Sequence, residues 1–377
     1  RKYHGLEDCE KYLNACVSAS ETFMNESGYT LYKSGSTPYR DLFASINLQA
    51  DEVIFGRDYE ASLSVLHNVQ NYENSTTMGR PGMNKKIVNS YLMADGSRFT
   101  DKAGYETMTF DQECQNRDPR LAQTIRTPGY TRIGSTKKEA PNLAYTMTGY
   151  HLIKYSMTAN YDEYNKSCND IPLFRTAEVY LNFAEAKAEL GTLKQADINK
   201  SIKLLRDRVG MTNLDMELAN SKPDPYLMSA ATGYPNVKGA NQGVILEIRR
   251  ERTIELAMEG FRYYDIMRWK EGKLFENDLL GIYVPGPGTY DLDKDGTDDV
   301  CFYVGTKPAG NVPLYLEIGE QIRLSNGESG YIICHSLITK KWNEDRDYLY
   351  PVPISERTLS NGVITQNPGW NDGLNFN

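Results

Sequence analysis

The sequence lacks the common short motifs of enzymes and metal proteins. It contains no Gly-x-Ser-x-Gly, His-Glu-x-x-His, Walker A or Gly-x-Gly-x-x-Gly motif. The six cysteines include no Cys-x-x-Cys pair and no zinc-type spacing, and the four histidines are scattered along the chain. No nucleophile, zinc or nucleotide-binding signature is therefore available, and we expect most cysteines to be small buried residues.

Long apolar runs and excess positive charge are also missing. No stretch of 18 apolar residues occurs, so the sequence predicts no membrane-spanning helix. Lys and Arg total 42 against 50 Asp and Glu, which gives a formal net charge of −8. An acidic chain is poorly suited to nucleic acid or to an anionic membrane surface, so we predict neither as a partner.

Tyrosine, in contrast, is abundant: 27 residues against 11 Phe and 3 Trp. Its ring combines a flat apolar face with a polar tip, which suits stacking on sugars and wet interfaces. We expect most of these rings to complete the core of a large helical protein and a minority to be available for binding.

The most informative stretch runs from Val244 to Lys270, VILEIRRERTIELAMEGFRYYDIMRWK. As one helix it would have apolar residues on two opposite faces, so we predict that it is buried between two layers. Arginines lie within reach of its acids, Glu251, Glu255 and Glu259. Because an unpaired buried charge is costly, we predict an ion-pair lattice between helices; an acid/base catalytic group is the alternative.

Within this stretch, ERTIELAMEGFRYYDIMRW resembles the signature helix of the SusD/RagB family, the outer-membrane glycan-capture lipoproteins of gut and oral Bacteroidetes. Further pieces are similar to the same family and spread the resemblance over nearly the whole chain. They are SGYTLY (27–32), SYLMADGSRF (90–99), NRDPRLAQTIRTPG (116–129), RTAEVYLNFAEAKAELG (175–191) and YLYPVPISERTLSNGVITQNPGW (348–370).

The resemblance implies a mostly α fold, with tetratricopeptide-like helical hairpins in a SusD-like α-solenoid, a loop-rich ligand region and small β elements. It also implies a non-catalytic protein at the extracellular face of the outer membrane. Such a protein captures an oligosaccharide and delivers it to a SusC-like TonB-dependent transporter. Membrane attachment would come only from an N-terminal lipid anchor, on a part of the precursor that precedes Arg1.

We expect one SusD-like domain over residues 1–377 with four regions. Residues 1–61 form a helical hairpin region, 62–169 a loop-rich ligand region, 170–272 a tetratricopeptide-like hairpin with the signature helix, and 273–377 a mixed β and loop region. Asp170 is predicted to cap a helix that has Pro172 in its first turn and ends at Gly191. A short helix is predicted at Ile354 to Leu359, with the chain end held by Trp370.

The loop-rich region 62–169 is the predicted ligand region, because a structureless loop of this length is uncommon unless it is functional or disordered. Aromatic rings would stack on sugar faces while polar side chains hydrogen-bond the hydroxyl groups. The candidate rings from this region are Tyr72, Tyr91, Phe99, Tyr105, Tyr130 and Tyr145. In the NRDPR segment, Arg117, Asp118 and Arg120 are predicted to stabilise a turn by pairing rather than to bind ligand.

A calcium ion is the one cofactor that the sequence suggests. Asp291, Asp293, Asp295 and Gly296 have the opening spacing of a calcium loop, with oxygen ligands at alternate positions. The twelfth position is Phe302 rather than Glu, so we favour no metal there and an Asp-Gly hairpin turn instead.

Glycan capture is therefore the predicted function, and the chain is not expected to be an enzyme. A glycoside hydrolase stays open as an alternative, because two carboxylates brought together by folding would suffice for that chemistry. A structural or peptide-binding partner of the transporter is the second alternative.

Overall fold

The computed structural model describes residues 1–371, so positions 372–377 of the predicted C-terminal region lie outside the described residues. The α-helices are α1 (Cys9–Glu26), α2 (Pro38–Ala44), α3 (Val69–Glu73), α4 (Lys85–Ser90), α5 (Phe110–Glu113), α6 (Thr176–Glu189), α7 (Gln195–Asn199), α8 (Ile202–Asp207), α9 (Met216–Ser221), α10 (Pro225–Met228), α11 (Gln242–Glu255), α12 (Phe261–Arg268) and α13 (Ile354–Leu359). The strands are β1 (Val53–Arg57), β2 (Ile171–Arg175), β3 (Leu279–Val284), β4 (Gly288–Tyr290), β5 (Val300–Tyr303), β6 (Leu314–Glu317) and β7 (Gly330–Cys334).

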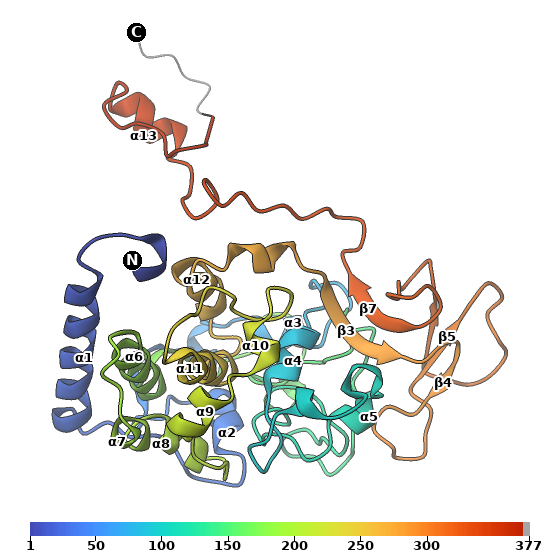
Figure 1. Cartoon of the computed structure of the whole chain (residues 1–377). Helices are drawn as coiled ribbons and strands as arrows, with labels where there is room; N and C mark the ends of the chain where they lie inside the picture. The colour runs from blue at the N-terminus through green and yellow to red at the C-terminus, as the bar shows by residue number, and fades with distance from the viewer. Residues whose placement is uncertain (372–377) are drawn as a thin grey trace.

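Helix α11 occupies the centre of the helical half of the molecule, with α6 on one side and α9 and α4 on others (Figure 1). Every residue from Gly243 to Glu255 is buried. This confirms the prediction that the stretch lies between layers. Its apolar side chains join those of α6, α7 and α8 in one core cluster, which includes Ala184, Ile198 and Ile248.

The predicted single helix from Val244 to Lys270 is wrong, because the helix breaks after Glu255 and resumes as α12 at Phe261. Met258 and Gly260 both have left-handed backbone angles, φ 64° and 86°. The break leaves the carbonyl of Ala257 without a helical partner, and this carbonyl accepts a hydrogen bond from the Lys154 ammonium at 2.6 Å. A buried long-range partner thus replaces the helical hydrogen bonds that would have continued α11.

The helix predicted to start at Asp170 is also corrected. Residues Ile171–Arg175 form strand β2, which pairs antiparallel with β1, and α6 begins only at Thr176. The Asp170 carboxylate caps no helix; it accepts hydrogen bonds from the backbone N–H groups of Leu48 and Tyr59. Leu173 and its neighbour Phe174 are both exposed, at 45% and 54%, where the pairing of β2 with β1 shifts register.

The rest of this region follows the prediction more closely. Helix α6 ends at Glu189, and Gly191, just past its C-cap, has a φ of 74°, the left-handed conformation of the glycine that follows a helix end. Two short helices, α7 and α8, follow, and their residues Ile198, Ile202 and Leu205 are fully buried. The assignment of this pair to a tetratricopeptide repeat stays a prediction.

The C-terminal part carries two small sheets, which lie at the opposite end of the molecule from α1 (Figure 1). Strands β3 and β7 pair antiparallel, while β5 pairs antiparallel with β4 and parallel with β6. Their inward residues share a core cluster with the loop-rich region, where Tyr150 meets Ile282 and Phe302. The loop-rich region is therefore packed firmly between the helices and the sheets.

Helix α13 stands apart from the body at the end of a long extended segment (Figure 1). Its bounds, Ile354–Leu359, match the predicted helix, and Trp370 donates a hydrogen bond to the carbonyl of Leu349 at 2.9 Å. All six cysteines have free thiols. None of the helices over residues 1–371 combines the length and the hydrophobicity needed to cross a bilayer.

Candidate ligand site

The acids of α11 are bound to arginines inside the protein, not arranged for catalysis. Glu251 lies 2.5 Å from Arg120 and 2.8 Å from Arg206. Glu255 lies 3.1 Å from Arg120 and 2.5 Å from Arg208. All five side chains are at least 95% buried. This arrangement is the predicted ion-pair lattice.

The lattice continues past the end of the helix. Arg175 lies 2.8 Å from Glu255 and 2.7 Å from Glu259, and Lys154 lies 2.7 Å from Glu259. Burial raises the pKa of the Glu255 carboxyl, but Arg208, Arg175 and Arg120 outweigh burial and hold that pKa well below its usual range. A carboxylate held ionised by three guanidinium groups cannot serve as a general acid near neutral pH.

The NRDPR turn belongs to the same structural network. Arg120 lies 2.7 Å from Asp118 and is 1% exposed. Arg117 donates hydrogen bonds to the carbonyls of Glu113 and Val88, each at 2.6 Å. These contacts fit the predicted structural role and leave neither arginine available to a ligand.

Three of the six candidate rings are core residues. Tyr91, Phe99 and Tyr130 are 0%, 1% and 6% exposed. The guanidinium of Arg117 covers Phe99, and those of Arg40 and Arg126 lie against Tyr130. Since protein atoms cover these rings, they offer no face on which a sugar could stack, and the binding role predicted for them does not hold in this fold.

The other three rings reach the surface but do not form one site. Tyr72 is 50% exposed, while Tyr105 and Tyr145 are half-buried. Tyr105 contacts Phe99 edge to face, and Tyr145 contacts His151. A role for Tyr72, Tyr105 and Tyr145 in binding stays a prediction.

A pocket of about 420 Å³ opens between the loop-rich region and the C-terminal sheets. We call it the Arg80 pocket. The loop-rich region contributes Arg80 and Met147, while the C-terminal part contributes Arg323 and the segment from Ile332 to Ile338. The Cys334 thiol joins the two sides, since it donates to the carbonyl of Met147 at 3.4 Å, and Met147 in turn donates its backbone N–H to the carbonyl of Arg80 at 3.0 Å.

Two residues of the Arg80 pocket have unusual backbone angles. Arg80 and His335 adopt left-handed conformations, φ 48° and 56°, which are uncommon for residues other than glycine. Such strain gathers at functional sites, where the surrounding structure maintains it. In addition, Arg80 Nε is buried and has no hydrogen-bond partner in the described structure. The pocket thus holds a donor that a ligand oxygen could satisfy.

The chemistry of the Arg80 pocket favours binding over bond cleavage. Glu320 is the one carboxylate among the described residues that line it. Burial raises the pKa of the Cys334 thiol to about 11, although Arg80 and Lys340 oppose this shift, so the thiol is protonated and weakly nucleophilic at neutral pH. Aliphatic wall residues, including Leu316 and Ile332, lie beside the polar groups.

The Arg80 pocket could not be predicted from the sequence. Arg80 lies in an Arg-Pro-Gly turn signal, but nothing in a single sequence connects that turn with residues 332–338. The segment after β7 has one visible feature, the exposed pair Leu337 and Ile338, at 80% and 60%. Exposed apolar side chains indicate a binding site only when the pocket beside them is known, so the sequence alone would not single out this pair.

A second group of rings was also missed. Tyr263 contacts Tyr264, Phe275 and Tyr350, with ring centroids 5.5 to 6.3 Å apart, and Phe275 contacts Trp342. These residues come from α12, from the turn after it and from the segment that leads to α13. Only the Tyr-Tyr pair at the start of this set was visible within the signature stretch.

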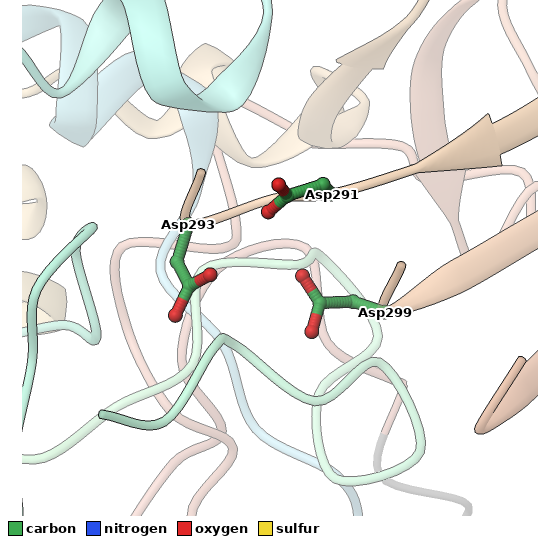
Figure 2. Close-up of side chains that lie close together, drawn as sticks. All are labelled: Asp291, Asp293 and Asp299. Carbon is green, nitrogen blue, oxygen red and sulfur yellow. The ribbon is translucent and has the colours of Figure 1, made fainter. Parts of the chain in front are cut away.

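The structure brings together three aspartates of the segment considered as a possible calcium loop, and only two of them are among those given by the spacing in the sequence. Asp291, Asp293 and Asp299 bring carboxylate oxygens within 4.8 Å of one another, and Figure 2 shows the three side chains turned toward one space. Asp295, the third aspartate of that spacing, instead donates its backbone N–H to Asp291 and Asp293, and Asp299 takes its place. Strands β4 and β5 pair antiparallel, with Tyr290 opposite Val300. This pairing places Asp299, which precedes β5, beside Asp291, which follows β4.

The fold and the pocket define a class: a mainly helical scaffold that presents a partly polar binding pocket beside a small β part. The family model for the SusD family matches residues 42–370, and the chain belongs to that family.

Two solved structures show the same fold. A SusD-like protein from Bacteroides fragilis is 21% identical with a TM-score of 0.61, and a SusD-like carbohydrate binding protein from the same species is 21% identical with a TM-score of 0.59. Alignments cover 96% and 93% of this chain but only 62% and 61% of those proteins, so this chain spans under two thirds of their length. No curated protein matches the sequence.

Proposed function

We propose that this protein is a non-catalytic glycan-binding component of the outer membrane, which holds an oligosaccharide for a SusC-like TonB-dependent transporter. Family membership supports the proposal, as does the likeness in fold to the SusD-like carbohydrate binding protein from Bacteroides fragilis. The extracellular location, the lipid anchor and the transporter partner follow from the same family resemblance.

The observation that carries the proposal is the chemistry of the Arg80 pocket. Arg80, Arg323, Gln321 and Glu320 offer both donors and acceptors, and aliphatic side chains lie beside them. A sugar ring presents the matching pattern of hydroxyl groups and C–H surface. Glycoside hydrolysis usually needs two carboxyl groups on either side of the scissile bond, whereas this pocket has one.

A glycan array followed by affinity electrophoresis in gels that contain soluble polysaccharide tests the proposal. We expect retention of the wild-type protein by at least one polysaccharide, and weaker retention of Arg323→Ala and Arg80→Gln. Arg57→Ala, an exposed arginine of β1 outside the pocket, is the matched control and should be retained like the wild type. Equal retention of all four proteins would place the site elsewhere.

A further inference from the structure

A second pocket lies in the helical half of the molecule, between the loop at residues 95–98 and helices α8 and α9. Its volume is about 300 Å³, and it shares no lining residue with the Arg80 pocket. We call it the Arg206 pocket. The apolar part of its wall consists of Leu92, Leu214 and Ala219 together with Leu218 at the rim.

Arg206 gives this pocket an unsatisfied donor. The residue is 97% buried, its exposed fraction being 3%. Its Nε donates to Glu251 at 2.8 Å and its Nη1 donates to the carbonyl of Thr212 at 3.3 Å. Its Nη2 is buried and has no partner anywhere in the described structure. A buried donor left unpaired is unfavourable, so a ligand oxygen that accepts a hydrogen bond from it would be favoured.

Three carboxylates complete the polar part of the wall: Asp95, Asp215 and Glu247, of which Glu247 lies 3.0 Å from Arg250 and is therefore already paired. Asp95 accepts hydrogen bonds from the backbone and side chain of Ser97 through Oδ1. Asp215 caps α9 by accepting from the Leu218 N–H, also through Oδ1. In the described structure these bonds leave Oδ2 of each aspartate to accept from a ligand hydroxyl group.

The charges at the Arg206 pocket decide the class of ligand. Arg206 is neutralised by Glu251, and the other arginine of the wall, Arg98, lies 3.7 Å from Asp224. Asp95 and Asp215 would repel an anion. A neutral molecule with several hydroxyl groups and an apolar face matches the wall, since it can accept from Arg206, donate to the two aspartates and cover the leucines.

We propose that the Arg206 pocket binds one neutral sugar unit, as a site separate from the Arg80 pocket. The volume is at the lower end of the range for small-ligand pockets, which fits a single sugar ring better than a longer chain. The inference goes beyond oligosaccharide capture for the transporter, because binding here needs no residue of the Arg80 pocket.

The test is a titration of the full chain, labelled with nitrogen-15 and deuterium, with glucose, galactose, mannose or N-acetylglucosamine. We expect at least one of these sugars at millimolar concentration to shift the amide signals of Gly96, Asn213 and Leu214 in a saturable way. Sodium acetate and sodium sulfate should leave these signals unchanged. Amide signals of Met147 and His335 report on the Arg80 pocket in the same spectra.

Two variants make the test specific. Arg206→Lys keeps a cation beside Glu251 but removes the Nη2 donor, and Asp215→Asn keeps a good helix cap but removes the carboxylate. Each should weaken the sugar-induced shifts at least tenfold in apparent affinity while the rest of the spectrum remains native. Glu217→Gln, an exposed residue of the same helix outside the pocket, is the control and should bind like the wild type.

The outcomes separate this inference from the proposed function. Shifts at Met147 and His335 alone would support oligosaccharide capture and overturn a sugar site at Arg206. An absence of shifts at Gly96, Asn213 and Leu214 with all four sugars would also overturn it. The inference would also be overturned if the Arg206→Lys variant folded and bound a sugar as tightly as the wild type. Signal shifts caused by sulfate or acetate, without shifts caused by any sugar, would overturn it as well.

Discussion

Arg175 and Glu255 lie 2.8 Å apart at the centre of the protein, although 80 positions separate them in the sequence. Arg175 is the last residue of strand β2, directly before α6, and Glu255 is the last residue of α11. Both side chains are at most 2% exposed. Their contact joins the β1–β2 ribbon to the central helix, so the acids of the signature stretch connect elements of the scaffold.

Removing one partner of this lattice should destabilise the fold strongly. In Glu255→Gln, the guanidinium groups of Arg120, Arg175 and Arg208 lose their shared counter-charge in a buried place. We expect a loss of about 3–5 kcal/mol in the free energy of unfolding. Urea unfolding measures it. Glu217→Gln, at an exposed site, should change the free energy by less than about 0.5 kcal/mol. Equal stability of the two variants would contradict the lattice.

Glu73 should make stability depend on pH in the opposite sense to an ion-paired acid. Burial raises the pKa of its carboxyl to about 7, and the hydrogen bond from Ser156 opposes the shift only in part. The folded state therefore holds this proton more tightly than the unfolded state. Stability due to Glu73 is greatest below about pH 4.5, and it falls as the pH rises toward 7.

Glu73→Gln should therefore raise the free energy of unfolding by about 2 kcal/mol at pH 8 and leave it nearly unchanged at pH 4.5. Urea unfolding of the variant and the wild type at both pH values measures the difference. A variant that is less stable than the wild type at pH 8 would show that the folded protein needs the Glu73 carboxylate.

The buried and exposed tyrosines should respond differently to substitution. Tyr130→Ala removes a ring held between Arg40 and Arg126, and we expect a loss of about 3–5 kcal/mol, as for other large core residues. Tyr72→Ala, at a half-exposed ring, should cost less than about 0.5 kcal/mol. Thermal unfolding separates the two cases. If both variants melted like the wild type, the burial of Tyr130 would be wrong.

The three aspartates of the β4–β5 loop allow a test of whether calcium binds there, against the favoured hairpin turn without a metal. Burial raises the pKa of Asp299 to about 6, and the carboxylates of Asp293 and Asp291 add to the shift. Calcium should therefore raise the melting temperature more at pH 7.5 than at pH 5.5, since protonation removes a ligand. Asp299→Asn should abolish the rise, while Asp298→Asn, outside the trio, should keep it. If calcium does not raise the melting temperature at pH 7.5, these aspartates bind no calcium and only stabilise the hairpin turn.

The sequence correctly predicted those helix ends that depend on residues close by in the chain. Gly191 follows the end of α6 in a left-handed conformation, and α13 has the expected bounds, because each depends on a few neighbouring positions. The burial of α11 followed from apolar residues on two faces. The acids Glu251 and Glu255 were predicted to pair, since an unpaired buried charge is costly and arginines lie nearby in the sequence.

Long-range contacts account for the errors. Residues 171–175 form a strand because β1 lies beside them, and α11 stops because Lys154 takes the carbonyl of Ala257. The Arg80 pocket joins segments around residues 80, 147 and 335, which only the folded chain brings together. The abundance of tyrosine did not distinguish core rings such as Tyr91 from exposed ones such as Tyr72.

The central claim is that this protein holds a glycan and breaks no bond. The most direct measurement is to incubate the protein with mixed oligosaccharides, isolate the complex, release the bound fraction by heat and determine its chain lengths by mass spectrometry. We predict a retained oligosaccharide of unchanged length, in smaller amount with Arg323→Ala. Recovery of shortened products would contradict the account, and so would the absence of any retained oligosaccharide.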